Sequence, residues 1–250
     1  MLQSSDFIFG CGTIGSRISK KLSYNLLNKA LELNINNFDI SPIYGKGLAE
    51  KYLSEFANSK KKNLICNIKY GQDLKFDLKT VLINIYRLEF LNLIRVFSYK
   101  NQNFSIKNIK LIVERYLLDK KIKYKTFFFH SPKISIRSIH PEILYYLKNK
   151  KLKIGYTSPF IYDNLKYLCE KSNIDIIQLS ADEYLKYKNT IKNKFKKEIW
   201  INQIIKFSKK NRIDWLNFCE DIKKEYKKVK FVIGFNHLHM LQKIEDKLYS

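Results

Sequence analysis

Four side chains able to take part in proton transfer follow short apolar runs of the sequence. Asp39 ends the run NNFD, Tyr44 follows it across a short turn, Lys69 ends NLICNIK, and His130 ends TFFFH. Runs of this kind are typical of buried strands, and the parallel strands of a barrel aim the residues at their carboxyl ends at one mouth. We therefore expect these four side chains to converge.

Together these residue types could protonate an oxygen on which negative charge develops. A buried tyrosine beside an ammonium has its phenolate stabilised, so we expect the pKa of Tyr44 to fall below its usual value of about 10. Asp39 would keep the Lys69 ammonium charged, and His130 could hydrogen-bond and orient a carbonyl oxygen. This is half of a carbonyl reduction. The other half is a hydride, which requires a nicotinamide cofactor.

Each residue alone also has a structural explanation. Asp39 could cap the turn that follows it, Tyr44 could be a packing tyrosine, and His130 could be a core histidine. Lys69 is harder to explain structurally, because a lysine that ends an apolar strand needs an acidic partner. The occurrence of all four at strand ends favours the chemical interpretation.

The elements that would position these residues alternate along the chain. Amphipathic stretches with apolar residues three and four apart predict helices at Lys20–Leu33, Ala49–Ala57, Ile106–Leu118, Glu142–Lys150, Ile161–Lys171 and Asp214–Tyr226. Between them, eight short apolar runs predict strands at Phe7–Gly10, Asn37–Ile40, Leu64–Lys69, Thr126–His130, Lys153–Thr157, Asp175–Ser180, Ile199–Ile205 and Lys230–Gly234. Eight parallel strands with helical crossovers predict an α/β fold, a (β/α)8 TIM barrel, as one domain over residues 1–250. The long Gln72–Ser105 insertion is expected to cover the active face.

Composition limits the function classes. The 250 residues are 45% hydrophobic, and the four cysteines are isolated, which indicates neither a disulfide framework nor a zinc site. No amino-terminal leader and no apolar span of about 18 residues is seen, so we expect a cytoplasmic protein without a membrane partner. The net charge is +24, but the lysines are scattered. We therefore expect no nucleic-acid partner. The alternative, charge-driven nucleic-acid binding, predicts that the affinity for nucleic acid falls steeply as the salt concentration rises.

The chain resembles the aldo-keto reductase family. The segment FDISPIYGKGLAE is similar to the family pattern Asp-x-(Ala/Ser)-x-x-Tyr-Gly followed by a Glu, here Glu50. IKYG and FFFHSP resemble the segments that carry the family's lysine and histidine, and KIGYTSPF and DIIQLSADEY resemble its fifth and sixth strands. The correspondence runs in order from about Phe7 to Ile244.

The resemblance implies an NAD(P)H-dependent reduction of an aldehyde or ketone. The wide, basic loops of this chain favour a sugar or another polar aldehyde as the substrate. Tyr44 would be the general acid, Lys69 and Asp39 would tune it, and His130 would orient the small-molecule carbonyl substrate. The cofactor would contact Thr157, Gln178, Asp182, which stands where Asn is common, and Gly234. We expect NADP(H) in preference to NAD(H).

The chain departs from the family pattern near its carboxyl end. The seventh strand leads into INQIIKFSKKN, which lacks the glycine of the family's cofactor loop, and no Arg or Lys closely follows Gly234. Lys206, Lys209 or Lys210 could hold the cofactor instead, whereas His237 and His239 are interpreted as incidental surface residues. A non-catalytic barrel that binds a nucleotide or a protein partner, with eroded cofactor loops, is the alternative function.

Overall fold

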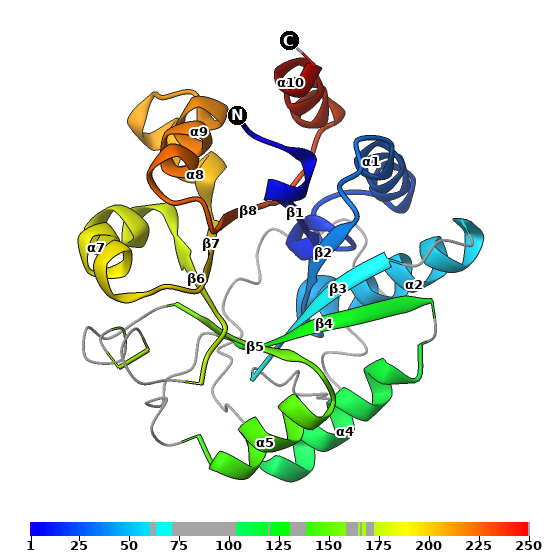
Figure 1. Ribbon diagram of the computed structural model, residues 1–250. Helices are drawn as coiled ribbons and strands as arrows, with labels where there is room; N and C mark the ends of the chain where they lie inside the picture. Colours follow the sequence, from blue (N-terminus) through cyan, green and yellow to red (C-terminus); the bar gives the residue numbers. More distant parts are fainter. Residues whose placement is uncertain are drawn as a thin grey trace.

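The structure, a computed structural model, describes residues 1–60, 64–71, 104–119, 121–130, 139–158, 165, 167–168 and 173–249. Within these residues, eight parallel strands close into a barrel in sequence order, with β8 paired to β1. Helices surround the barrel on its outside (Figure 1). The prediction of a (β/α)8 TIM barrel is confirmed.

The strands agree with the sequence analysis in order and mostly in extent. Two differ by more than one residue: β4 begins four residues before the predicted Thr126, and β7 ends three residues before the predicted Ile205. The strands are β1 (Phe7–Gly10), β2 (Asn37–Ile40), β3 (Leu64–Tyr70), β4 (Ile122–Phe129), β5 (Lys153–Thr157), β6 (Ile176–Ser180), β7 (Glu198–Asn202) and β8 (Val229–Ile233).

The helices alternate with the strands. They are α1 (Lys20–Glu32), α2 (Leu48–Lys60), α4 (Ile106–Leu117), α5 (Pro141–Asn149), α7 (Ala181–Lys194), α8 (Ile204–Asn211), α9 (Trp215–Glu225) and α10 (Leu238–Tyr249), with 3-10 turns η1 (Ser4–Asp6), η2 (Cys11–Thr13) and η3 (Tyr44–Gly47). The predicted helix Ile161–Lys171 and the Gln72–Ser105 insertion lie largely outside the described residues. No helix in the described part of the chain is long and apolar enough to cross a membrane.

Alternate residues of the strands fill two apolar layers. Phe7 and Phe9 of β1 belong to the large cluster between the barrel and its helices. Ile8, between them, belongs to a separate cluster that fills the barrel interior. In that interior the rings of Phe128 and Trp200 lie 4.8 Å apart between centroids. Because side chains fill the barrel, a binding site can form only at its ends.

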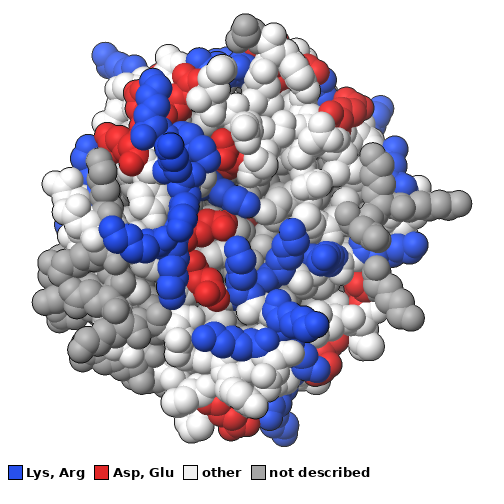
Figure 2. All heavy atoms as spheres, in the orientation of Figure 1, with Lys and Arg blue, Asp and Glu red and all other residues white. Residues whose placement is uncertain are grey.

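Positive charge is spread over the end of the barrel where the strands begin. Figure 1 looks onto this end, with the amino-terminal segment and η1 in front of β1. Figure 2, in the same orientation, shows lysine and arginine side chains across the face, with acidic ones interspersed among them.

We expect Gly155→Ala in β5 to destabilise the barrel. A Cβ at Gly155 would come within 2.2 Å of Phe128 Cδ1. Phe128 has no room to move because it packs against Trp200 in the filled interior. The free energy of unfolding, measured by urea denaturation, should fall by about 1–3 kcal/mol. In a Phe128→Leu background the same substitution should cost less, and equal losses in both backgrounds would contradict this account.

Candidate active site

The segment after β2 places Asp39 and Tyr44 at the carboxyl end of the barrel. Asp39 is buried within β2, and Tyr44 begins the turn η3. Gly45 has a φ of +55°, and a Cβ there would lie 2.7 Å from the Ile14 carbonyl oxygen. The glycine directly after Tyr44 therefore lets η3 pack closely against the loop that follows β1.

A buried ion pair joins β2 to β3. Lys69 Nζ donates a hydrogen bond to Asp39 Oδ2 at 2.7 Å, and the two side chains are only 4% and 2% exposed. The same ammonium lies 3.4 Å from the Tyr44 hydroxyl oxygen. Because an ammonium is costly to bury unless it is paired, Asp39 is what allows Lys69 to contact Tyr44 inside the protein.

His130 completes the group from the end of β4. Its backbone N–H donates to the Tyr70 carbonyl oxygen at 2.8 Å, and its Nδ1 lies 3.4 Å from Ser41 Oγ. The imidazole ring is nearly perpendicular to the Tyr44 ring, at 6.2 Å between centroids. The structure thus brings Asp39, Tyr44, Lys69 and His130 together.

The acidity of Tyr44 differs from the prediction made from the sequence. Burial, together with the nearby Asp39 carboxylate and Cys11, raises the pKa of Tyr44 well above its usual value, whereas the sequence argument expected Lys69 to lower it. The reason is that the Lys69 charge is largely balanced by Asp39, which lies closer to it than Tyr44 does. Tyr44 is therefore held as the protonated phenol, a form that can donate its proton.

His130 is neutral at ordinary pH. Burial, and secondarily the positive charge of Lys69, lowers its pKa to about 3. A neutral imidazole offers one hydrogen-bond donor and one acceptor. It can therefore bind a carbonyl oxygen without adding a charge to the site.

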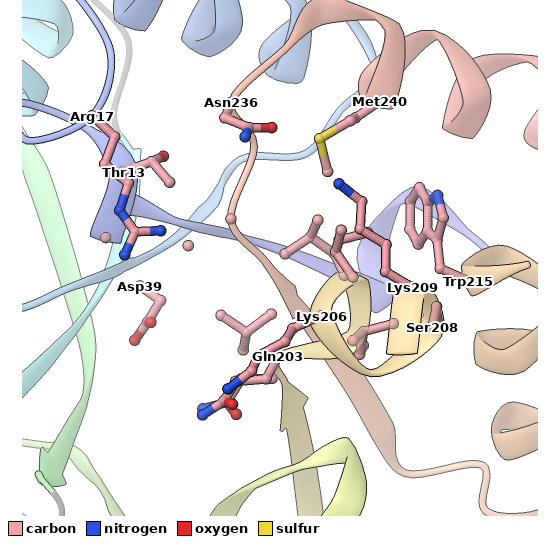
Figure 3. A pocket seen from close by; sticks show the side chains of 18 of the residues that line it. Thr13, Arg17, Asp39, Gln203, Lys206, Ser208, Lys209, Trp215, Asn236 and Met240 are labelled. Carbon is pink, nitrogen blue, oxygen red and sulfur yellow. The ribbon is translucent and has the colours of Figure 1, made fainter. Parts of the chain in front are cut away.

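A cavity of about 1030 Å³ opens beside these four residues. In Figure 3, Thr13 and Arg17 lie on one side of it, and Lys206, Ser208 and Lys209 line the other side from α8. Among the residues predicted to bind the cofactor, Thr157, Gln178 and Gly234 also line the cavity.

Asp182 does not lie in this cavity. It is exposed in the first turn of α7, and its carboxylate lies 3.5 Å from Lys210 Nζ. The strand β6 ends at Ser180, and the turn of α7 then carries Asp182 away from the barrel mouth. In the structure Asp182 and Lys210 therefore form an ion pair at the surface, and neither residue lines the cavity.

The cavity wall carries buried polar atoms that have no hydrogen-bond partner within the described residues. Gln178 is completely buried, and both its Oε1 and its Nε2 lack a partner. Asp39 Oδ1, Asn202 Oδ1 and Ser208 Oγ are in the same condition, and all four residues line this cavity. Because an unsatisfied buried polar atom costs about 1–3 kcal/mol, such a set indicates a polar ligand. The Gln178 side chain offers one free hydrogen-bond donor and one free acceptor, which together could pair with the amide group of a ligand.

The link between β7 and α8 replaces the missing glycine loop. Gln203 alone separates the two elements, and it adopts a left-handed conformation with φ 56° and ψ 19°. Helix α8 then begins at Ile204 on the cavity wall, so its first backbone N–H groups, which have no partner within the helix, are available to an anion. The sequence IIKFSKK changes from strand to helical periodicity. This signal could have predicted the helix, but the predicted strand was extended through Ile205 instead.

Cations surround the outer part of the cavity. Apart from Lys69, which is paired with Asp39, the cavity wall carries five cations, and no carboxylate in the described ranges forms an ion pair with any of them. The Asp214 carboxylate on the same wall caps α9. His237 and His239 stack on each other at the rim, at 5.4 Å between centroids. The five cations are Arg17, Lys206, Lys209, Arg212 and Lys243.

No group of three or more His, Cys, Asp or Glu side chains within the described ranges is arranged to hold a metal ion. The cations and amides of the cavity instead match an organic anion that carries a carboxamide.

Known proteins resemble this chain in sequence pattern and in fold. The model of the aldo/keto reductase family matches residues 6–204. A putative aldo-keto reductase from Pseudomonas aeruginosa has 16% sequence identity and a TM-score of 0.66, with 96% of this chain and 87% of that chain covered. An aldo-keto reductase from Bacillus halodurans in its holo form has 18% identity and a TM-score of 0.59, with 80% and 62% covered.

A glycerol dehydrogenase from Gluconobacter oxydans has 16% identity and a TM-score of 0.59, with 80% of this chain and 60% of that chain covered. This chain therefore spans less than two thirds of the length of the last two proteins. No match to a curated protein sequence was found. At these identities the structural likeness bears on the fold alone.

The lowered pKa of His130 makes a prediction about stability. An unfolded histidine takes up a proton below about pH 6.5, whereas folded His130 takes one up only near pH 3. Stability contributed by this group is therefore present at neutral pH and is lost as the pH falls from about 6.5 towards 3. The loss is at most about 1.4 kcal/mol per pH unit. Urea unfolding of wild type and His130→Gln at pH 7 and pH 5 measures it. The wild type should lose more stability than the variant, and parallel losses would contradict the assignment.

Proposed function

The chain belongs to the aldo/keto reductase family, and we propose that it reduces an aldehyde or ketone to an alcohol with NAD(P)H, with Tyr44 as the general acid. The observation that carries this proposal is the contact chain from Asp39 through Lys69 to the Tyr44 hydroxyl, at 2.7 and 3.4 Å, beside a large polar cavity. We take residues 1–250 as one catalytic domain.

Tyr44 would protonate the substrate oxygen as negative charge develops on it. A reduced nicotinamide, when bound, supplies the hydride for the carbonyl carbon. Loss of the proton leaves a phenolate 3.4 Å from the Lys69 ammonium, which stabilises it. This attraction exists only once the proton has moved, so it favours the transition state over the bound substrate. His130, with its hydrogen on Nε2, would orient the carbonyl oxygen.

Other cavity residues suit the cofactor. Gln178, with a free donor and a free acceptor, would hold the carboxamide together with Thr157. The amino terminus of α8 and Lys206 would bind the pyrophosphate, near Gly234 on the neighbouring loop. The remaining cations, among them Arg212 and Lys243, exceed what a pyrophosphate needs, and this excess favours NADP(H) over NAD(H).

Replacement of Tyr44 tests the proposal. With NADPH or NADH and a panel of small polar aldehydes, we expect wild type to oxidise the cofactor and Tyr44→Phe to lose about 100-fold or more in kcat. Cofactor affinity, followed by the fluorescence of Trp215 on the cavity wall, should stay unchanged. Tyr145→Phe is the matched control, because Tyr145 is 69% exposed on α5.

Three outcomes would contradict the proposal. Undiminished turnover by Tyr44→Phe would remove Tyr44 as the acid. A wild-type protein that binds NADPH without reducing any aldehyde would exclude the reaction with that panel. Failure to bind either cofactor at millimolar concentration would favour a non-catalytic barrel.

A further inference from the structure

Charged residues also gather at the opposite end of the barrel, where the strands begin. Strand β4 carries Lys123 and Lys125 at its second and fourth positions. Strand β5 begins with Lys153, and β8 carries Lys230 at its second position. We call Lys123, Lys125, Lys153 and Lys230 the basal lysine cluster. The filled interior of the barrel separates this cluster from the catalytic cavity.

Strand alternation directs part of the cluster toward the barrel axis. Val232, two residues after Lys230, belongs to the interior apolar cluster. Gly155, two residues after Lys153, faces the interior ring of Phe128. Since side chains two apart on a strand share a face, Lys153 and Lys230 point to the same side as the interior residues, at the open end of the barrel.

A β-bulge brings Lys125 to the same place. In the pairing of β3 with β4, Cys66 lies opposite Tyr124 and the next residue, Asn67, lies opposite Thr126, so Lys125 is an extra residue in the ladder. Bulges of this kind re-aim a side chain. Partial burial and the positive charges of Lys123, Lys230 and Lys153 lower the pKa of Lys125, which agrees with a close grouping of the four ammonium groups.

The charge of the cluster is not balanced by the described residues. Glu198 at the start of β7 lies 3.4 Å from Lys153 Nζ and 3.8 Å from Lys230 Nζ, and it also accepts a hydrogen bond from Trp200 Nε1. Neither Lys123 nor Lys125 has an ion pair with a carboxylate in the described ranges. Within the described residues, the four lysines of the cluster thus share one ion-paired carboxylate, that of Glu198. Figure 2 shows lysine and arginine side chains near the centre of this face, with acidic ones beside them.

We propose that the basal lysine cluster binds a phosphate-type oxyanion, either free phosphate or the phosphoryl group of a small molecule, at a site separate from the catalytic cavity. A compact anion with two or more negative charges relieves the repulsion among several ammonium groups at once. A single carboxylate cannot do this, as the unbalanced charge around Glu198 shows. Lysines, which act as flexible point charges, suit the rounded shape of a phosphate.

Residue-resolved acetylation tests the site. Intact protein is treated with limiting acetic anhydride, and mass spectrometry gives the acetylation rate of each lysine. We expect pyrophosphate to slow acetylation of Lys125 about threefold when its concentration is about twice the dissociation constant. Sodium chloride of equal ionic strength is the reference. Lys21 on α1, which has no ion pair within the described residues, should react at an unchanged rate.

Matched variants separate this site from general charge effects and from the cavity. Lys153→Gln should weaken the protection of Lys125, whereas Lys21→Gln, with the same loss of charge, and Lys209→Gln in the cavity wall should not. Protection by inorganic phosphate identifies the free ion as a ligand, and protection by a sugar phosphate alone identifies a phosphorylated metabolite.

The proposal is overturned if none of pyrophosphate, inorganic phosphate and the sugar phosphate slows the acetylation of Lys125, if Lys21 is slowed equally, or if only a polyanion such as heparin protects Lys125. The last outcome would make the face a macromolecular surface.

Discussion

The ion pair between Lys69 and Asp39 is the interaction on which the candidate active site depends. Both groups are almost fully buried, and breaking such a pair by removing one partner costs about 3–5 kcal/mol. The pairing of β2 with β3 sets Asp39 opposite Asn67, two residues before Lys69. Closure of the barrel therefore fixes the two charges in contact, and the same ammonium reaches Tyr44.

Under the proposed reaction, this arrangement would make Tyr44 a weak acid at rest and a proton donor once the substrate is bound. Burial and the Asp39 charge raise its pKa, so the proton stays on Tyr44 until a substrate oxygen becomes more basic than the phenolate. The Lys69 ammonium then lies against the new phenolate. The neutral His130 completes the site without a competing charge. The unsatisfied amide of Gln178 shows where a second polar molecule would complete the cavity.

The sequence predicted the barrel and the convergence of Asp39, Tyr44, Lys69 and His130 because both follow from strand patterns. The bounds of β1, β2 and β5 were predicted correctly, and residues at strand ends converge in any parallel barrel. The start of β4 was missed because Lys123 and Lys125 interrupt its apolar run. The start of α8 was missed because Gln203 takes a left-handed conformation that a glycine would have signalled. The pKa direction of Tyr44 was wrong because it depends first on how completely the side chain is buried and then on its distance from the Asp39 carboxylate, neither of which can be read from a sequence.

Transfer of a labelled hydride tests the central claim most directly. The protein would be incubated with NADPH carrying two deuterium atoms at C4 of the dihydronicotinamide and with a reducible aldehyde, and the alcohol would be analysed by mass spectrometry. The account predicts one deuterium on the carbinol carbon of the product. Alcohol without deuterium, or no alcohol from protein that has bound the cofactor, would contradict it.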